Sequence, residues 1–97
     1  MSDRTFIRHT VLFSAKNKDD IGRIIEGLSQ LKDIPHATML EVRANTRVDQ
    51  IANEIDVVVY GEFADQSALQ AYKAHDLYQR AIDIVRPLRD KRIAVDF

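Results

Sequence analysis

The sequence has no cysteine and no tryptophan, and only two prolines and three glycines. Without cysteine, the 97 residues cannot form a disulfide framework, a thiolate nucleophile or a cysteine-ligated metal site. An excess of one charge is also lacking, since 14 basic residues stand against 15 acidic ones. The chain therefore lacks the basic surface expected of a protein that binds nucleic acid or an anionic membrane.

Long apolar runs are missing as well. No segment approaches membrane-spanning length, and the opening MSDRTFIRH lacks the hydrophobic core of a signal peptide. We therefore expect a cytoplasmic protein with one domain over residues 1–97. Hydrophobic residues make up 45% of the chain, which is typical of a globular protein. Because a monomer of this size keeps much of its surface exposed, association with a second copy is a natural expectation.

Hydrophobic patterning predicts elements in the order β-α-β-β-α-β. Runs rich in β-branched and aromatic residues predict strands over 5–15, 37–44, 54–63 and 91–97. Apolar residues at helical spacing predict a helix over 19–33, ended by Pro35, and a second helix in two pieces, 67–75 and 77–88. This order is that of a ferredoxin-like α+β fold, in which helices cover one face of an antiparallel four-stranded sheet.

Alternation along the strands sorts their residues onto two faces. One set is apolar apart from His9 and is expected to face the helices; on the last strand it comprises Ile93, Val95 and Phe97. The opposite set, which on the last strand comprises Arg92 and Asp96, mixes charged residues with large apolar ones. On the other strands it includes Phe6, Arg8, Leu12, Met39, Glu41, Val58 and Tyr60. Such a mixture suits an interface between two copies of the chain. A solvated sheet face with scattered apolar residues is the alternative.

Four segments of the chain carry a family resemblance: HTVLF, LKDIPHATMLEVRAN, GEFADQSALQAYKAH and VRPLRDKRIAVDF. Together they resemble the stress-responsive A/B barrel (Dabb) family over essentially the whole chain. The resemblance implies a dimeric α+β barrel, in agreement with the pattern of the two sheet faces. Members of this family include stress-related proteins, one of them chaperone-like, and a cyclase that closes a linear polyketide by aldol condensation without a cofactor.

The resemblance to that cyclase implies candidate site residues. The catalytic tyrosine of the cyclase falls on Tyr72, the first histidine of its helix motif on His75, and its pocket histidine on His9. Its catalytic base, a second histidine, falls on Tyr78. A tyrosine with a reference pKa of about 10 is a poor general base near neutrality, although it can donate a hydrogen bond to an enolate oxygen.

Each candidate also has a purely structural interpretation. His9 is either a pocket base or a core histidine bonded to a backbone carbonyl. Tyr72 and His75 lie on one helix face, but Asp76 is a good N-cap for the second helical piece, so His75 could simply end the first. The three histidines lack a ligand spacing such as His-x-x-x-His, so we expect no metal.

The last quarter of the chain is basic, but aspartates are interspersed. Its basic residues are Arg80, Arg86, Arg89, Lys91 and Arg92, and its acidic residues are Asp83, Asp90 and Asp96. Mixed charge of this kind is typical of a solvated surface, and the pattern does not by itself support an anion site.

Two functions remain open at this point. The first is a homodimer that binds a small apolar or aromatic ligand between helices and sheet, lined by Val11, Phe63 and Tyr78. As an enzyme, it would be a cofactor-free isomerase or cyclase with His9, Tyr72 and His75 as catalytic residues. The second is a non-catalytic, stress-related structural or chaperone-like protein in which these side chains only pack.

Overall fold

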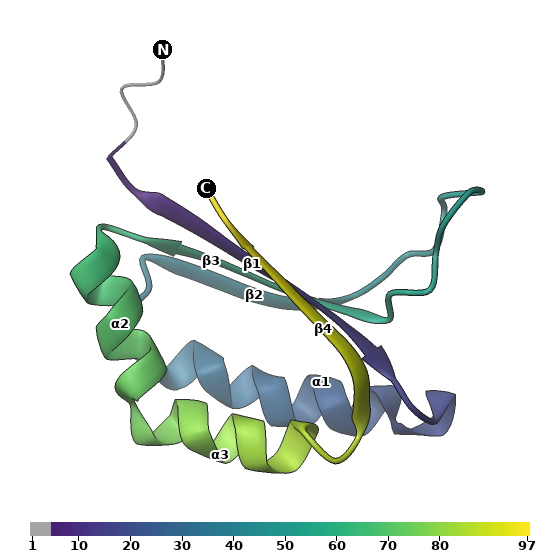
Figure 1. Ribbon diagram of the computed structural model, residues 1–97. Coiled ribbons are helices and arrows are strands. Elements are labelled where there is room, and N and C mark those ends of the chain that lie inside the picture. Colours follow the sequence, from purple (N-terminus) through teal and green to yellow (C-terminus); the bar gives the residue numbers. More distant parts are fainter. Residues whose placement is uncertain (1–4) are drawn as a thin grey trace.

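In the computed structural model, which describes residues 5–97, all helices lie on one face of a single sheet (Figure 1). The strands are β1 (Ile7–Ala15), β2 (Met39–Ala44), β3 (Val57–Phe63) and β4 (Arg89–Asp96), and the α-helices are α1 (Ile21–Ser29), α2 (Gln66–Ala74) and α3 (Asp76–Val85). Short 3-10 helices, Lys18–Asp20 and Gln30–Asp33, flank α1. The predicted ferredoxin-like α+β fold is confirmed.

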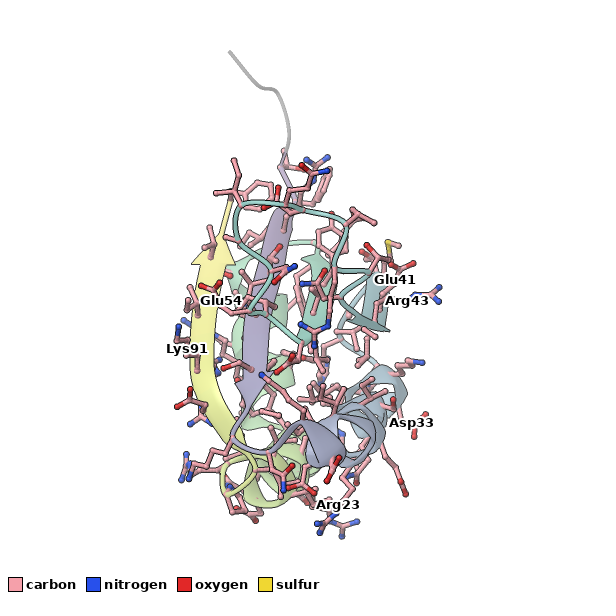
Figure 2. All side chains as sticks on the ribbon, turned by 90° about the vertical axis from the view of Figure 1, so that its right-hand side faces the viewer. Arg23, Asp33, Glu41, Arg43, Glu54 and Lys91 are labelled. Atoms are coloured by element: carbon pink, nitrogen blue, oxygen red, sulfur yellow. The ribbon has the colours of Figure 1, made fainter. Side chains whose placement is uncertain are left out.

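The sheet is antiparallel and its strand order is β2-β3-β1-β4. The first and third strands are therefore central, and β2 and β4 form the edges. Figure 2 places Glu41 and Arg43 at the β2 edge and Lys91 at the β4 edge. Charged side chains on edge strands discourage the addition of a further strand.

The core lies between the helices and the covered face of the sheet. Val57, Val59 and Phe63 of β3 are fully buried there, together with Ile24 of α1. Gly27 lets α1 approach α3 closely, because a Cβ at this position would lie 2.8 Å from Ile84 Cγ2. The close approach explains why a residue with poor helix propensity stands inside α1.

The break between α2 and α3 falls at His75, as the two-piece pattern predicts. His75 has extended backbone angles, and its Nδ1 accepts a hydrogen bond from the backbone N–H of Leu77 at 3.1 Å. The expectation that Asp76 caps α3 is wrong, since Asp76 is the first residue of that helix. Its carboxylate still lies in the first turn, where the helix dipole favours negative charge.

The face assignment of β4 made from the sequence is also wrong. Asp96 pairs with His9 and Arg92 pairs with Phe13, so both side chains share the covered face with their partners. Ile93 pairs instead with Leu12 on the open face. Alternation separates two faces but does not say which one meets the core, and a shift of one residue exchanges them. The apolar set of β4 therefore faces away from the helices.

The open face is consequently more apolar than the sequence pattern indicates. On the other strands, the residues predicted to lie on the open face do lie there in the observed register: Arg8, Leu12, Met39, Glu41, Val58 and Tyr60. The Arg8 guanidinium lies 5.4 Å from the ring centre of Phe6 and 5.8 Å from that of Phe97. Ile93, Val95 and Phe97 are 48%, 51% and 52% exposed, so an apolar strip of β4 faces solvent in the monomer.

A buried carboxylate ties the segment between β2 and β3 to the end of β1. Asp56 accepts hydrogen bonds from the backbone N–H of Ala15 at 2.7 Å, from Lys18 Nζ at 2.7 Å and from Arg47 Nη2. Burial alone would raise the pKa of Asp56, but the bonds from Lys18, Arg47 and Ala15 outweigh it and lower the pKa to about 2. Asp56 is therefore ionised at neutral pH.

Among residues 5–97, none of the helices combines the length and apolar character that crossing a bilayer requires.

Candidate functional site

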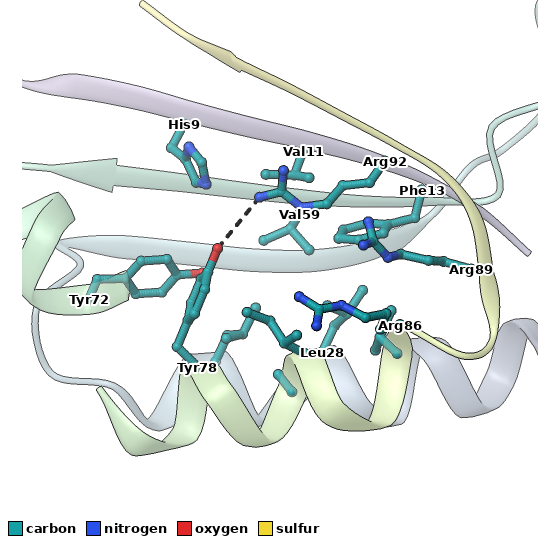
Figure 3. A pocket seen from close by; sticks show the side chains of 14 residues that line it. His9, Val11, Phe13, Leu28, Val59, Tyr72, Tyr78, Arg86, Arg89 and Arg92 are labelled. Carbon is teal, nitrogen blue, oxygen red and sulfur yellow. Dashed lines mark hydrogen bonds between the residues drawn. The ribbon is translucent and has the colours of Figure 1, made fainter. Parts of the chain in front are cut away.

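A cavity of about 210 Å³ lies between the covered face of the sheet and α3 (Figure 3). Its walls are mainly apolar: Val11, Phe13, Leu28, Leu31, Val59, Ala81, Ile82 and Val85. Its polar lining consists of His9, Tyr72, Tyr78, Arg86, Arg89 and Arg92. An apolar cavity of about 150 Å³ is enough to hold benzene. This cavity can therefore hold a six-membered ring with a substituent.

His9 is held in place by a carboxylate from the neighbouring strand. The imidazole is 1% exposed, and its Nδ1 bonds to Oδ1 of Asp96. Because an ionised carboxylate only accepts hydrogen bonds, Nδ1 carries the proton. In the neutral ring this leaves the lone pair on Nε2, the nitrogen available to a ligand in the cavity. The alternative of a core histidine is therefore right about burial but wrong about the partner, which is Asp96 and not a backbone carbonyl.

Aromatic rings pack beside His9 at the same end of the cavity. The ring centre of Tyr72 lies 4.8 Å from that of Phe63, 5.2 Å from that of Tyr78 and 6.3 Å from that of His9. Burial, with a smaller contribution from Tyr78, raises the pKa of Tyr72 well above its ordinary value. The Tyr72 hydroxyl therefore stays protonated and can act as a hydrogen-bond donor but not as a base.

The Tyr78 hydroxyl connects the aromatic end of the cavity to the arginines. It accepts a hydrogen bond of 3.5 Å from Nη2 of Arg92, which Figure 3 shows as a dashed line. The side chains of Arg86 and Arg89 lie farther along the same cavity, away from His9 (Figure 3). The cavity thus offers a base and hydroxyl donors at one end, an apolar body, and positive charge along the rest of its rim.

A metal centre is not suggested by this arrangement. Within residues 5–97, His, Asp and Glu side chains do not gather in any group of three that could hold a metal ion.

Comparison with known proteins agrees with this architecture. Residues 7–97 match the model of the stress responsive A/B barrel domain, or Dabb. The chain belongs to the Dabb family. No curated protein matches this Dabb chain.

Solved structures with the same fold include dimers. A dimeric ferredoxin-like protein of unknown function from Thermobifida fusca is 25% identical with a TM-score of 0.81, over 100% of this chain and 93% of that one. A Dabb family protein from Mesorhizobium loti is 24% identical, with a TM-score of 0.80 over 97% and 96% of the two chains. A dimeric protein of unknown function from Bacteroides fragilis is 18% identical, with a TM-score of 0.79 over 97% and 96%. The last two likenesses show the fold alone.

The structure of this Dabb protein brings together part of the site predicted from the sequence. His9, Val11, Tyr72 and Tyr78 line one cavity. Phe63 lies against Tyr72 but does not line the cavity. His75 does not line it either, because its Nδ1 caps α3, and its ring centre lies 6.2 Å from that of His36.

Four polar residues of this Dabb site were missed: Arg86, Arg89, Arg92 and Asp96. The spacing of three between the arginines was a visible signal, but the interspersed aspartates made it look like ordinary surface. Asp96 and Arg92 were placed on the other face of the sheet by the wrong assignment of β4. The strand register places Arg92 in the cavity lining and Asp96 against His9.

Proposed function

We propose that this protein is a homodimer in which each subunit binds a small, mainly apolar ligand and catalyses a cofactor-free proton transfer on it. The observation that carries this proposal is buried His9, which bonds to the half-exposed Asp96 and lines an apolar cavity beside two tyrosines. A histidine oriented by a carboxylate, with hydroxyl donors nearby, is suited to general base catalysis with stabilisation of an oxyanion.

The proposed reaction follows from the position of each group. His9 Nε2 removes a proton from a carbon next to a ligand carbonyl, and the electron pair of that C–H bond moves into the enolate. The Tyr72 or Tyr78 hydroxyl donates a hydrogen bond to the enolate oxygen, and Asp96 stabilises the imidazolium. Return of the proton from the imidazolium to another atom gives an isomerase. Attack of the enolate carbon on a second carbonyl forms a C–C bond and an alkoxide, which takes the proton from the imidazolium, and this gives a cyclase. His75 has no role in this scheme because its Nδ1 is engaged in capping α3.

The homodimer is proposed to form through the open sheet face. Half-exposed Ile93, Val95 and Phe97 extend the apolar strip formed with Leu12 and Val58. Arg8 Nε is buried without a hydrogen-bond partner among residues 5–97, a cost that a polar group from a second copy would relieve. Structural neighbours that are described as dimeric support a homodimer.

A non-catalytic, stress-related role is the second candidate. It is favoured by Tyr78, which occupies the position where the resemblance to the family's cyclase requires a histidine base. In that case the side chains around the cavity would only pack. Exchange of a ligand C–H proton with deuterated solvent distinguishes the two, because the enzyme predicts exchange that depends on His9 and the non-catalytic protein predicts none.

Ligand binding is testable through the histidines. We expect a panel of aromatic acids and lactones to shift the NMR resonances of the His9 ring, because that ring lines the cavity. Exposed His36, which is not among the lining residues, provides the internal control. An unchanged His9 signal across the whole panel would contradict the binding proposal.

The contribution of the Tyr72 hydroxyl is tested by Tyr72→Phe. The ring and its contacts with Phe63 remain, so we expect the protein to stay folded. Carbonyl-containing ligands should bind about three- to tenfold more weakly, the usual value of one hydrogen bond. Affinity is measured by the titration of the His9 resonances. Equal affinity for carbonyl ligands in both proteins would remove Tyr72 from the proposed oxyanion site.

A further inference from the structure

Resting on the proposed binding function, we infer that the ligand is a small apolar acid whose anionic group is held by Arg86, Arg89 and Arg92. Each of these arginines lines the cavity that His9 enters from the other end (Figure 3). The inference concerns the chemical class of the ligand, which the His9–Asp96 pair by itself does not specify.

Local backbone structure brings the three guanidiniums together. Arg86 is the C-cap of α3, and its N–H donates to Ile82 O at 2.8 Å. The N–H of Leu88 donates to Val85 O at 2.9 Å, which closes the turn into β4. Arg89 then begins β4, and Arg92 follows on the covered face opposite Phe13. The cluster is therefore built on hydrogen-bonded backbone and not on a long loop.

The positive charge of this cluster is not neutralised within the described chain. Among residues 5–97, none of the three arginines forms an ion pair with a carboxylate. Asp96, on the same face of β4 as Arg92, is bonded to His9, and Asp83 is bonded to Gln79. Burial, together with the charges of Arg92 and Arg86, lowers the pKa of Arg89 below its ordinary value. An anion bound among them would relieve this repulsion.

A second group of converging cations in the same chain serves as a comparison for the unpaired positive charge of the arginine cluster. Lys18 and Arg47 also converge, but they do so on the buried carboxylate of Asp56. The cluster at the cavity also has converging cations, but no carboxylate of residues 5–97 forms an ion pair with them. Guanidinium groups bind carboxylates and phosphates through paired N–H donors, so either anion could occupy the position. The apolar walls and the volume of about 210 Å³ favour a small ring or chain that carries a carboxylate.

The test compares benzoate with benzamide, which have similar shapes but differ in charge. We expect benzoate to bind at least about tenfold more tightly, as judged by titration of the His9 resonances, because charge-assisted hydrogen bonds are about twice as strong as neutral ones. Arg89→Gln should reduce the affinity for benzoate to that for benzamide and leave the affinity for benzamide unchanged. The control is Arg80→Gln, which removes a charge from an exposed position of α3 outside the cavity lining.

Thermal unfolding supplies a second readout that does not need an aromatic ligand. Arg89→Gln removes one of three mutually repelling charges, so we expect it to fold and to melt no lower than the parent protein. Inorganic phosphate should raise the melting temperature of the parent protein and of Arg80→Gln more than that of Arg89→Gln.

The two proposals fail in different ways in these experiments. Equal binding of benzoate and benzamide, with no effect of Arg89→Gln, overturns the anion site and leaves the proposed cavity function standing. Stabilisation by phosphate that depends on Arg89, with no response of His9 to either ring compound or to the rest of the ligand panel, supports the anion site and overturns the proposed function. Equal stabilisation of all three proteins by phosphate also counts against the anion site.

Discussion

Ile93→Asp is expected to convert the proposed dimer into a monomer. Ile93 is 48% exposed in the monomer and lies beside Leu12 on the open face. Burying a side chain of this size contributes about 1.5–3 kcal/mol, and a two-fold interface contains the position twice. Loss of both contributions, with a carboxylate to desolvate in each copy, weakens association on the order of a thousandfold or more. Sedimentation at micromolar concentration measures the change.

Ile51→Asp is the matched control for that experiment. Ile51 is 96% exposed on the segment between β2 and β3, outside the sheet, and the substitution makes the same chemical change. We expect this variant to remain as dimeric as the parent protein. A parent protein that sediments as a monomer would refute the interface itself. A dimeric Ile93→Asp variant would show that the interface does not include β4.

Asp56→Asn is expected to lower the free energy of unfolding at neutral pH by about 2–3 kcal/mol. The substitution keeps an oxygen that can accept from the N–H of Ala15, but it removes the negative charge that Lys18 and Arg47 contact. The magnitude follows from the lowered pKa of Asp56, since each unit of pKa corresponds to about 1.4 kcal/mol. For a chain of this length we expect a fall of about 10 °C or more in Tm at a fixed protein concentration.

The same carboxylate predicts how stability changes with pH. The pKa of Asp56 is about 2 in the folded protein, below the value of about 3.9 expected in the unfolded chain. The unfolded state therefore binds the proton more readily, so this stabilisation is complete above about pH 5 and is lost as the pH falls toward 2. Denaturant unfolding of the parent protein and of Asp56→Asn should converge over that range. Parallel pH curves would contradict the assignment.

Glu54→Gln controls for the loss of a negative charge in the same segment. Glu54 is exposed, and we expect this substitution to change the free energy of unfolding by less than about 0.5 kcal/mol. A loss as large as that of Asp56→Asn would mean that net charge, and not the buried contacts of Asp56, determines the stability of this segment.

The edge strand β4 links the proposed interface to the proposed site. One of its faces carries Ile93 and Val95 toward solvent, and the other carries Arg92 into the cavity lining and Asp96 against His9. A single strand thus supplies the apolar strip for association, the carboxylate that orients His9 and one guanidinium of the cluster. The alternation of polar and apolar residues along β4 is visible in the sequence. The two faces of this strand were assigned the wrong way round because apolar residues usually face a core.

The sequence by itself determined the elements of this protein and their order. Helical and strand periodicities are local properties, so the β-α-β-β-α-β order, the break at His75 and the mixed composition of one sheet face were all predictable. Three of the candidate residues named from the sequence, His9, Tyr72 and Tyr78, line one cavity, and their roles stay predictions.

Tertiary structure alone decided what surrounds those residues. His9 and Asp96 are separated by most of the chain, and they meet only because β4 pairs with β1 in one particular register. The convergence of Arg86, Arg89 and Arg92 depends on the same register and on the turn that precedes it. Register and cavity volume arise from packing between distant segments, and local propensity does not encode them.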